Sequence, residues 1–341
     1  MIILILIIGI SLLILIHEAG HFVAAKSFGI LVEEFGIGFP PRLLSKKIGE
    51  TVYSINLLPF GGFVRIHGEK PEFEKTENIP ERSFAHLKLW KRATIIGAGI
   101  VMNFFLGWFI LTGVYMVGVE QGILINHIDE NTPAMEVGLL AGDKIIGFED
   151  TTAFIAFIDA SQGKEISMHI VRGGDEQEIV VTPRVNPPEG EGALGIGLTD
   201  VEQQSLPFFV SLWEGLMTSL FVIGAICASL WGLIAGIFTG GGPSLENFVG
   251  PVGIFGVAEN AAQFGLTPLL HIIGLISLNL VVLNVLPIPA LDGGRLLFLL
   301  IEKIKGSPLS PKREVMANAI GFVALLLLMV VVTARDIFRL F

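Results

Sequence analysis

The hydrophobic positions of this chain are gathered into long runs without Asp, Glu, Lys or Arg. Four of them reach roughly 20 residues or more, the length that a helix needs to cross about 30 Å of hydrocarbon. They cover Ile2–Ala25, Ala93–Val119, the stretch between Glu259 and Asp292, and Val315–Ala334. The pattern therefore predicts a polytopic α-helical membrane protein with about four spanning helices.

Lys and Arg residues are distributed unevenly between these runs, and their distribution predicts the orientation in the membrane. Eleven of the 22 Lys and Arg residues lie between Lys26 and Arg92, so this loop is predicted on the cytoplasmic side. Residues 120–206 hold sixteen acidic residues against four basic ones and are predicted outside. Four basic residues at 303–313 place the last loop inside again.

A fifth apolar run, Leu206–Phe238, contains Glu214. With this orientation the run must start and finish on the same face, so we predict interfacial helices over 205–263 or a shallow hairpin. Residues 239–263 contain no Lys or Arg and are expected outside. The alternative, a full crossing by the fifth run, would move the basic loop at 303–313 outside.

Residues 120–204 have the pattern of a small β-rich domain with two short helices. Ile123–Ile125 and Lys144–Phe148 are predicted strands, and alternating apolar residues on both sides of the turn at 173–175 predict a hairpin. Thr132-Pro133 is typical of a helix start.

The loop at 31–92 is too apolar for a free linker, and Gly and Pro residues divide it into short predicted strands. We predict a membrane-associated β-hairpin whose segment Gly61, Gly62, Phe63, Val64 and Arg65 offers an unpaired edge. Such an edge can bind another chain in extended form. A purely structural plug is the alternative.

A candidate metal site lies inside the first apolar run. His17 and His21 are four residues apart, so on a helix their imidazoles share one face, and Glu18 stands beside them. In this H-E-x-x-H pattern two histidines bind zinc and the glutamate is the general base. Ionisable groups at membrane depth are costly and mark functional sites, which favours the metal site over a chance match or a signal peptide.

A third protein ligand is needed, because catalytic zinc sites have three and keep one position open. Asp292 is the best candidate, since Pro287 and Pro289 predict partly unwound backbone over Val285–Gly294, and at membrane depth such backbone is either buried in protein or lines a water-filled cavity. Glu33 or Glu34 would be the third ligand of a juxtamembrane enzyme instead. Asn284, a polar residue in the same apolar run, is a candidate oxyanion donor.

Composition agrees with a membrane protein. Hydrophobic residues make up 52% of the chain and charged residues only 16%. The net charge of −10 makes nucleic acid an unsuitable partner, and the single cysteine excludes an intrachain disulfide. The chain is expected to divide into a first spanning helix (1–30), a loop with the β-hairpin (31–92), a second spanning helix (93–119), the β-rich domain (120–204), interfacial helices (205–263), a third spanning segment (264–304), and a fourth spanning helix with the C-terminus (305–341).

The motifs together resemble the site-2 protease family of intramembrane zinc metalloproteases. The resemblance rests on His17-Glu18-x-x-His21, on the stretch from Asn284 to Gly294 with its two prolines and Asp292, and on Gly61–Arg65. It is closest to the bacterial regulator-of-sigma-E protease group. Residues 132–146 resemble a PDZ domain, of which this chain has one where that group often has two.

The resemblance implies zinc held by His17, His21 and Asp292, Glu18 as the base, and Asn284 near the scissile carbonyl. It implies a protein of the inner membrane with the PDZ-like domain outside, whose substrates are single-span membrane proteins such as anti-sigma factors or signal-peptide remnants. The runner-up is a membrane-anchored PDZ receptor with a vestigial or structural metal. For the PDZ-like domain we favour a size filter over recruitment of substrate tails.

Overall fold

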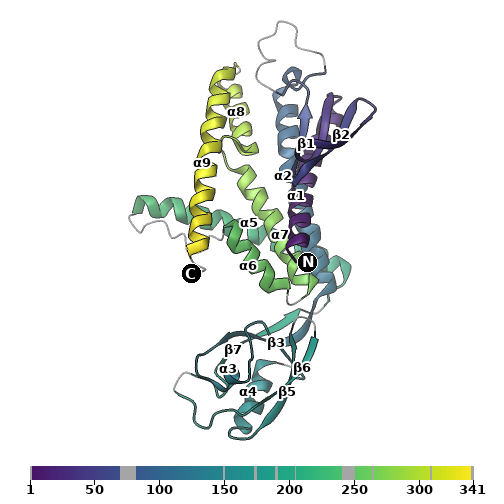
Figure 1. The fold of residues 1–341 in the computed structure, drawn as a ribbon. Helices are drawn as coiled ribbons and strands as arrows, with labels where there is room; N and C mark the ends of the chain where they lie inside the picture. Colours follow the sequence, from purple (N-terminus) through teal and green to yellow (C-terminus); the bar gives the residue numbers. More distant parts are fainter. Residues whose placement is uncertain are drawn as a thin grey trace. The chain divides into compact units, whose positions relative to one another are not determined.

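The computed structural model describes residues 2–69, 82–148, 150–172, 175–188, 191–203, 205–239, 250–262, 265–307 and 309–338 (Figure 1). The chain divides into two compact units, which are described separately. The first comprises Met1–Leu111, Gly215–Gly256 and Ile272–Phe341, and the second comprises Thr112–Glu214 and Val257–His271.

Five of the described helices are long and apolar enough to cross a membrane. They are α1 (Ile2–Ser27), α2 (Leu89–Val117), α5 (Phe208–Thr239), α7 (Leu266–Val285) and α9 (Pro311–Phe338). The predicted class, several apolar helices together with β-structure, is confirmed. Because α5 is one uninterrupted helix of 32 residues, the shallow hairpin considered for Leu206–Phe238 is wrong. The short helix α6 (Pro251–Ala262) follows it, and residues 240–249 and 263–264 of the expected outer segment lie outside the described residues.

Small residues let α1, α2 and α7 pack closely in the first unit. A Cβ atom on Gly20 of α1 would lie 2.5 Å from the carbonyl oxygen of Ala98 in α2. A Cβ atom on Gly107 of α2 would lie 2.7 Å from the Leu278 side chain in α7. Such glycines allow helix backbones to approach in a membrane, where packing rather than the hydrophobic effect holds helices together.

The backbone is unwound between α7 and α8 (Asp292–Lys305). The break covers residues 286–291, inside the stretch Val285–Gly294 predicted to be partly unwound, and the residues at the two ends of that stretch, Val285 and Asp292–Gly294, are helical. The freed backbone N–H of Ala290 donates to Oδ1 of Asn318 in α9 at 3.0 Å. A Cβ atom on Gly293 would lie 2.2 Å from the Leu286 carbonyl oxygen, so this turn requires a residue without a side chain.

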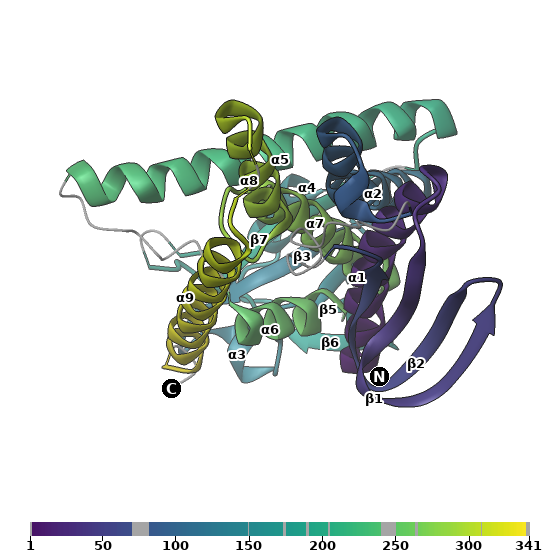
Figure 2. The same cartoon turned by 90° about the horizontal axis from the view of Figure 1, so that it is seen from above.

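Strands β1 (Val32–Ile48) and β2 (Thr51–Ile66) form a sheet that is more complex than a simple hairpin. Each long strand bends, and the first half of β1 pairs with both halves of β2. The resulting segment order is 42–48, 51–56, 32–37 and 62–66. Figures 1 and 2 show this sheet beside α1, on the side that faces away from α9. Among the described residues, segment 62–66 is an edge of the sheet.

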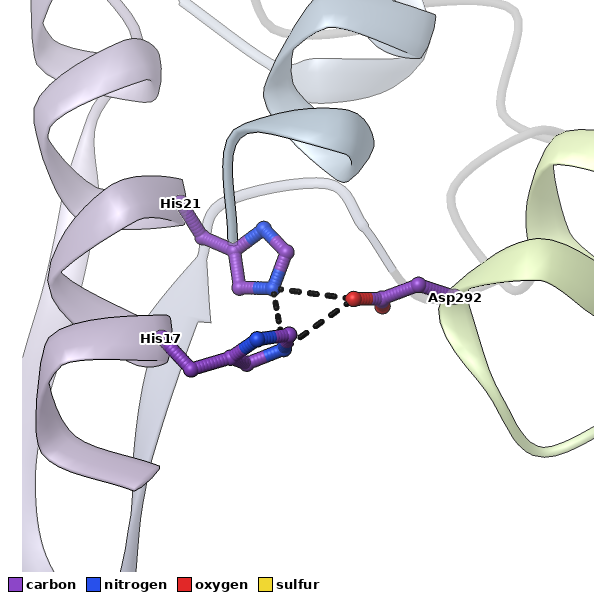
Figure 3. A group of neighbouring side chains, drawn as sticks. All are labelled: His17, His21 and Asp292. Carbon is purple, nitrogen blue, oxygen red and sulfur yellow. Dashed lines mark hydrogen bonds and ion pairs between the residues drawn. The ribbon is translucent and has the colours of Figure 1, made fainter. Parts of the chain in front are cut away.

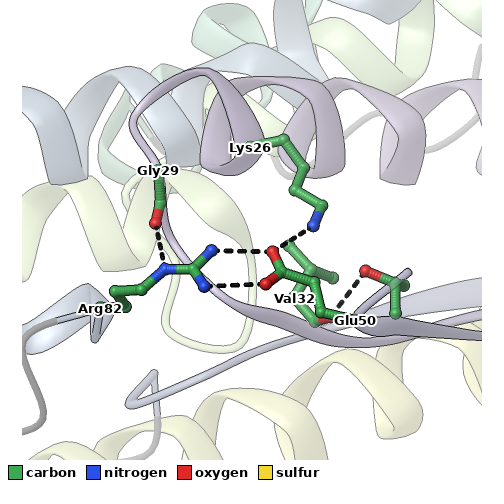
Figure 4. Close-up of polar contacts among 6 residues, drawn as sticks. Lys26, Gly29, Val32, Glu50 and Arg82 are labelled. Atoms are coloured by element: carbon green, nitrogen blue, oxygen red, sulfur yellow. Dashed lines mark hydrogen bonds and ion pairs between the residues drawn. The ribbon is translucent and has the colours of Figure 1, made fainter.

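A turn at Glu50 fastens this sheet to the end of α1 (Figure 4). Glu50 accepts hydrogen bonds from Nζ of Lys26 at 2.6 Å and from both terminal nitrogens of Arg82 at 2.7 and 2.8 Å. Arg82 also donates through Nε to the Gly29 carbonyl at 3.0 Å. These cations, Arg82 foremost, lower the pKa of the Glu50 carboxyl to about 2, so this contact is charged at neutral pH.

The second unit is a small β-domain built on a five-stranded antiparallel sheet with the order β6-β5-β4-β3-β7. Its strands are β3 (Val119–Ile128), β4 (Lys144–Ile146), β5 (Ile166–Arg172), β6 (Asp175–Val181) and β7 (Ile196–Gln203). Its helices are α3 (Pro133–Glu136) and α4 (Thr151–Ala160), and its core includes Ile123, Phe154 and Ile170. The sequence did not predict β7, and residues 173–174 of the predicted turn lie outside the described residues.

Candidate metal centre

Helix α1 places His17 and His21 on one face, and the first residue of α8 approaches them (Figure 3). The two Nε2 atoms are 3.1 Å apart. Oδ2 of Asp292 lies 3.1 Å from Nε2 of His17 and 3.4 Å from Nε2 of His21. Within the described residues, these three form the group whose ligand atoms are close enough to share a metal ion.

The triangle of ligand atoms has the size that zinc requires. A tetrahedral zinc ion with bonds of roughly 2.0–2.1 Å has ligand atoms about 3.3 Å apart, close to the three distances observed here. Oδ2 of Asp292 is buried and, within the described structure, has no hydrogen bond of acceptable geometry. A buried carboxylate oxygen without a donor is costly, and a bound cation would remove that cost. The residues present therefore fit zinc.

Helix α2 shapes the space around both imidazoles. Nδ1 of His21 lies 2.8 Å from the carbonyl oxygen of Ile95, an acceptor that fixes the ring proton on Nδ1 and leaves Nε2 free to bind a metal. A Cβ atom on Gly99 would lie 2.5 Å from Nε2 of His21 and 2.8 Å from Cε1 of His17. Gly99 therefore leaves room that a side chain would take from both rings.

A cavity of about 220 Å³ adjoins the three residues. Glu18, the predicted general base, also lines it. Its other lining residues are His17, His21, Phe63, Val64, Ile66, Glu69, Asp292 and Arg295. A Cβ atom on Gly62 would lie 3.7 Å from Cγ of Glu18, so the edge segment of β2 passes close to this side chain.

The remaining predicted residues lie at different distances from this cavity. Arg65 belongs to the edge segment 62–66, and Gly61 directly precedes this segment in β2. Unlike Phe63 and Val64, neither of them lines the cavity as described. Asn284 is half-buried in the last turn of α7 and is also absent from that lining, so its role as an oxyanion donor stays a prediction.

The two alternative third ligands are engaged in the sheet. Oε1 of Glu33 lies 2.7 Å from Nδ1 of His67. Glu34 is buried and accepts hydrogen bonds from Arg42 and from Ser54, both at 2.6 Å. Neither glutamate belongs to the described group of possible metal ligands, so the geometry favours Asp292.

Sequence reasoning missed the charged pair at the edge of the cavity. Nη2 of Arg295 lies 2.5 Å from Oε1 of Glu69, and both residues line the cavity. Arg295 follows Asp292 by three residues and therefore shares its face of α8. The sequence signal that could have indicated this pair is an arginine one helical turn after the candidate ligand Asp292.

An apolar helix bundle that brings two histidines, an aspartate and a glutamate around one cavity defines a membrane-bound metallopeptidase. Residues 5–328 match peptidase family M50, and the chain belongs to this family, that of the site-2 proteases. It is a zinc metalloprotease.

Three bacterial relatives are similar over nearly their whole length. The regulator of sigma-W protease RasP of Bacillus subtilis is 31% identical, and the alignment covers 96% of each chain. Zinc metalloprotease RasP of Shouchella clausii is 32% identical over 97% of each chain. That of Geobacillus kaustophilus is 33% identical over 96% of each chain. The alternative of a receptor without enzymatic activity is therefore not supported.

Proposed function

We propose that this protein cleaves peptide bonds within the transmembrane segments of single-span membrane proteins, in regulated intramembrane proteolysis. Anti-sigma factors and signal-peptide remnants are the substrate classes. The observation that carries this proposal is the cavity in which Glu18, the two histidines and Asp292 meet the edge segment 62–66 of β2. The name of the Bacillus subtilis relative, a regulator of sigma-W protease, supports the anti-sigma class.

The contacts at the ends of the helices support an arrangement with four crossings. Nη1 of Arg92, at the start of α2, donates to both carboxylate oxygens of Glu302 in α8 at 3.1 Å, so these two ends lie on one face. The end of α2 and the start of α7 then both belong to the opposite face. Helix α6 has 12 residues and spans about 18 Å, too short to cross. Helix α5 therefore lies along the membrane surface instead of crossing, and β1, β2 and the basic loop at 303–313 are cytoplasmic.

Each predicted site residue has its own task in the proposed reaction. His17, His21 and Asp292 hold zinc, which when bound polarises the peptide carbonyl and lowers the pKa of water toward about 7. Glu18 accepts the proton of the attacking water and donates it to the leaving amine. Asn284 donates a hydrogen bond to the developing oxyanion, a contribution of roughly 3 kcal/mol in other enzymes.

The edge segment 62–66 holds the substrate in extended form. A helix hides its peptide groups in i to i−4 hydrogen bonds, so the substrate must unwind before water can attack. Gly62–Ile66 pairs with 32–37 on one side, and within the described chain its other side has no strand partner. A substrate that adds to this side recovers backbone hydrogen bonds that it loses on unwinding. Phe63 and Val64 line the cavity, so the added strand would run past Glu18.

Substrates that unwind easily should therefore be cut faster. In a single-span substrate, two central Leu residues are replaced by Gly-Pro, and cleavage by the purified zinc-loaded enzyme is measured in proteoliposomes. We expect an increase of at least tenfold, because about 3 kcal/mol of helix stability is removed by proline alone. The same Gly-Pro pair at the far end of the segment is the matched control and should have little effect. Equal cleavage of a poly-leucine segment would contradict strand addition.

We further propose that the β-domain at 120–204 is an outer filter that excludes substrates with bulky outer domains. The alternative, recruitment of substrate tails, has one observation in its favour. A groove of about 270 Å³ lies between α4 and the loop leading into β7, an edge strand of its sheet. Arg184, however, already donates to Glu191 at 2.7 Å and to the Gly192 carbonyl at 3.1 Å. It is thus engaged by the loop that would have to bind a terminal carboxylate, which favours the filter.

Deletion of residues 121–203 distinguishes the filter from recruitment. With a Gly/Ser linker in their place, we expect normal zinc content, normal cleavage of short substrates, and new cleavage of untrimmed substrates. The point variant Ile155→Arg, which blocks the groove at an exposed position, should leave both substrates unaffected. Loss of short-substrate cleavage in both variants, with untrimmed substrates still resistant, would replace the filter by recruitment.

A further inference from the structure

His17 and His21 differ in how their second ring nitrogen is held. Each turns Nε2 toward Asp292 and so needs its lone pair on Nε2 to bind a metal, with the proton on Nδ1. An Nδ1–H group in a buried site needs an acceptor. For His21 the acceptor is the Ile95 carbonyl, which cannot donate and so fixes the tautomer. For His17 the group next to Nδ1 is a side chain and not a backbone carbonyl.

The contact of His17 is Asn103 in α2. Nδ1 of His17 lies 3.3 Å from the side-chain amide of Asn103. Asn103 is fully buried, and in the described structure its Oδ1 has no hydrogen-bond donor. An amide keeps its shape when it rotates by 180°, so the oxygen and the nitrogen can exchange places. Rotation brings the oxygen opposite Nδ1–H of His17, which is a donor.

The position of Asn103 is itself fixed by its surroundings. Oγ of Ser277, fully buried in α7, donates to the backbone carbonyl of Asn103 at 2.8 Å. Gly99 lies one helical turn before Asn103 and leaves space for both imidazoles. On one face of α2, Gly99 thus leaves space for the two candidate ligands of α1, and Asn103, four residues later, places its amide next to His17.

We propose that Asn103 is a positioning residue, whose amide oxygen accepts the Nδ1–H of His17 and holds Nε2 of that ring ready for zinc. The proposal rests on His17 being a metal ligand, as set out under the proposed function. Partners of this kind in other metal sites contribute roughly 10- to 100-fold to metal affinity or activity. Asn103 acts through His17 and does not touch the substrate.

The test combines metal affinity with the tautomer of His17. Zinc affinity of the full-length protein is measured by competition with a chelator. Asn103→Leu has a similar shape but no acceptor, and should lose about 10- to 100-fold in affinity. Asn103→Asp keeps an acceptor and should bind zinc within a few-fold of wild type. Thr112→Val removes a buried hydroxyl from the same helix, away from His17, and serves as the control.

The tautomer is measured on zinc-free wild-type protein by ¹⁵N NMR of labelled histidine, with His17→Gln used for assignment. We expect His17 to carry its proton on Nδ1. A proton on Nε2 would overturn the proposal even if no Asn103 variant folds. Unchanged affinity in Asn103→Leu, or equal losses in the Leu and Asp variants, would also overturn it. If His17→Gln itself keeps full zinc affinity, the proposed metal site fails, which is a different outcome from failure of Asn103.

Discussion

Replacing Glu18 by glutamine should leave zinc bound and reduce cleavage by about 10²- to 10⁴-fold, the contribution of a general base. The side chain of Glu18 lines the cavity but is not one of the three clustered ligand residues, so its charge is not needed to hold the metal. Glutamine has nearly the size of glutamate and still forms hydrogen bonds, but its amide cannot accept the proton. In this one variant zinc binding should therefore be retained while cleavage is lost.

The measurement is zinc per protein, together with single-turnover cleavage of the substrate segment used above. Glu33→Gln is the matched control, because Glu33 lies in β1, contacts His67 and does not line the cavity as described. It should cleave at the wild-type rate. Full activity in Glu18→Gln would contradict the proposed role of Glu18 as general base. Loss of zinc in that variant would show that Glu18 is a ligand.

The part of the site that lies on one helix could be predicted from the sequence. The length of the apolar run around His17 and His21 predicts a helix, and the spacing of four residues then brings both imidazoles to one face. Asp292 was named from chemistry, because prolines before it indicated unwound backbone. The distances of Asp292 from the two histidines depend on the packing of α1, α2 and α7, which no local pattern contains. The contacts of Gly99 and Asn103 with the two histidines depend on the same packing of α2 against α1.

The sheet at β1 and β2 shows where local patterns fail. Gly and Pro divide the sequence into short strands, which suggests a simple hairpin, but their pairing is decided by non-local contacts. Glu34 illustrates this, because its buried carboxylate accepts hydrogen bonds from Arg42 and Ser54, which belong to two other segments of the sheet. From the sequence alone this glutamate was an available metal ligand. Strand β7 was missed because Thr199, Asp200 and Glu202 interrupt its apolar pattern.

Asp292→Ala should lose both zinc and activity, whereas Glu33→Ala and Glu34→Ala should keep zinc. A zinc-binding free energy of about 10–16 kcal/mol shared over four ligands gives roughly 2.5–4 kcal/mol per ligand, so losing Asp292 should weaken binding by about 10²- to 10³-fold. Oδ2 of Asp292 approaches both histidine nitrogens, and among the described residues no other carboxylate belongs to that group. A second acid is therefore not in place to substitute for it.

Zinc content has to be the deciding measurement in this comparison, because activity alone is ambiguous for Glu34. Removing its buried carboxylate leaves Ser54 and Arg42 without their acceptor and should destabilise the sheet by about 1–3 kcal/mol. The edge segment 62–66 belongs to the same sheet, so Glu34→Ala can slow cleavage while zinc stays bound. Glu33 is partly exposed and makes the cleaner control. If Glu33→Ala or Glu34→Ala lost zinc and Asp292→Ala retained it, the metal would lie at the sheet of β1 and β2 and the enzyme would be a juxtamembrane one.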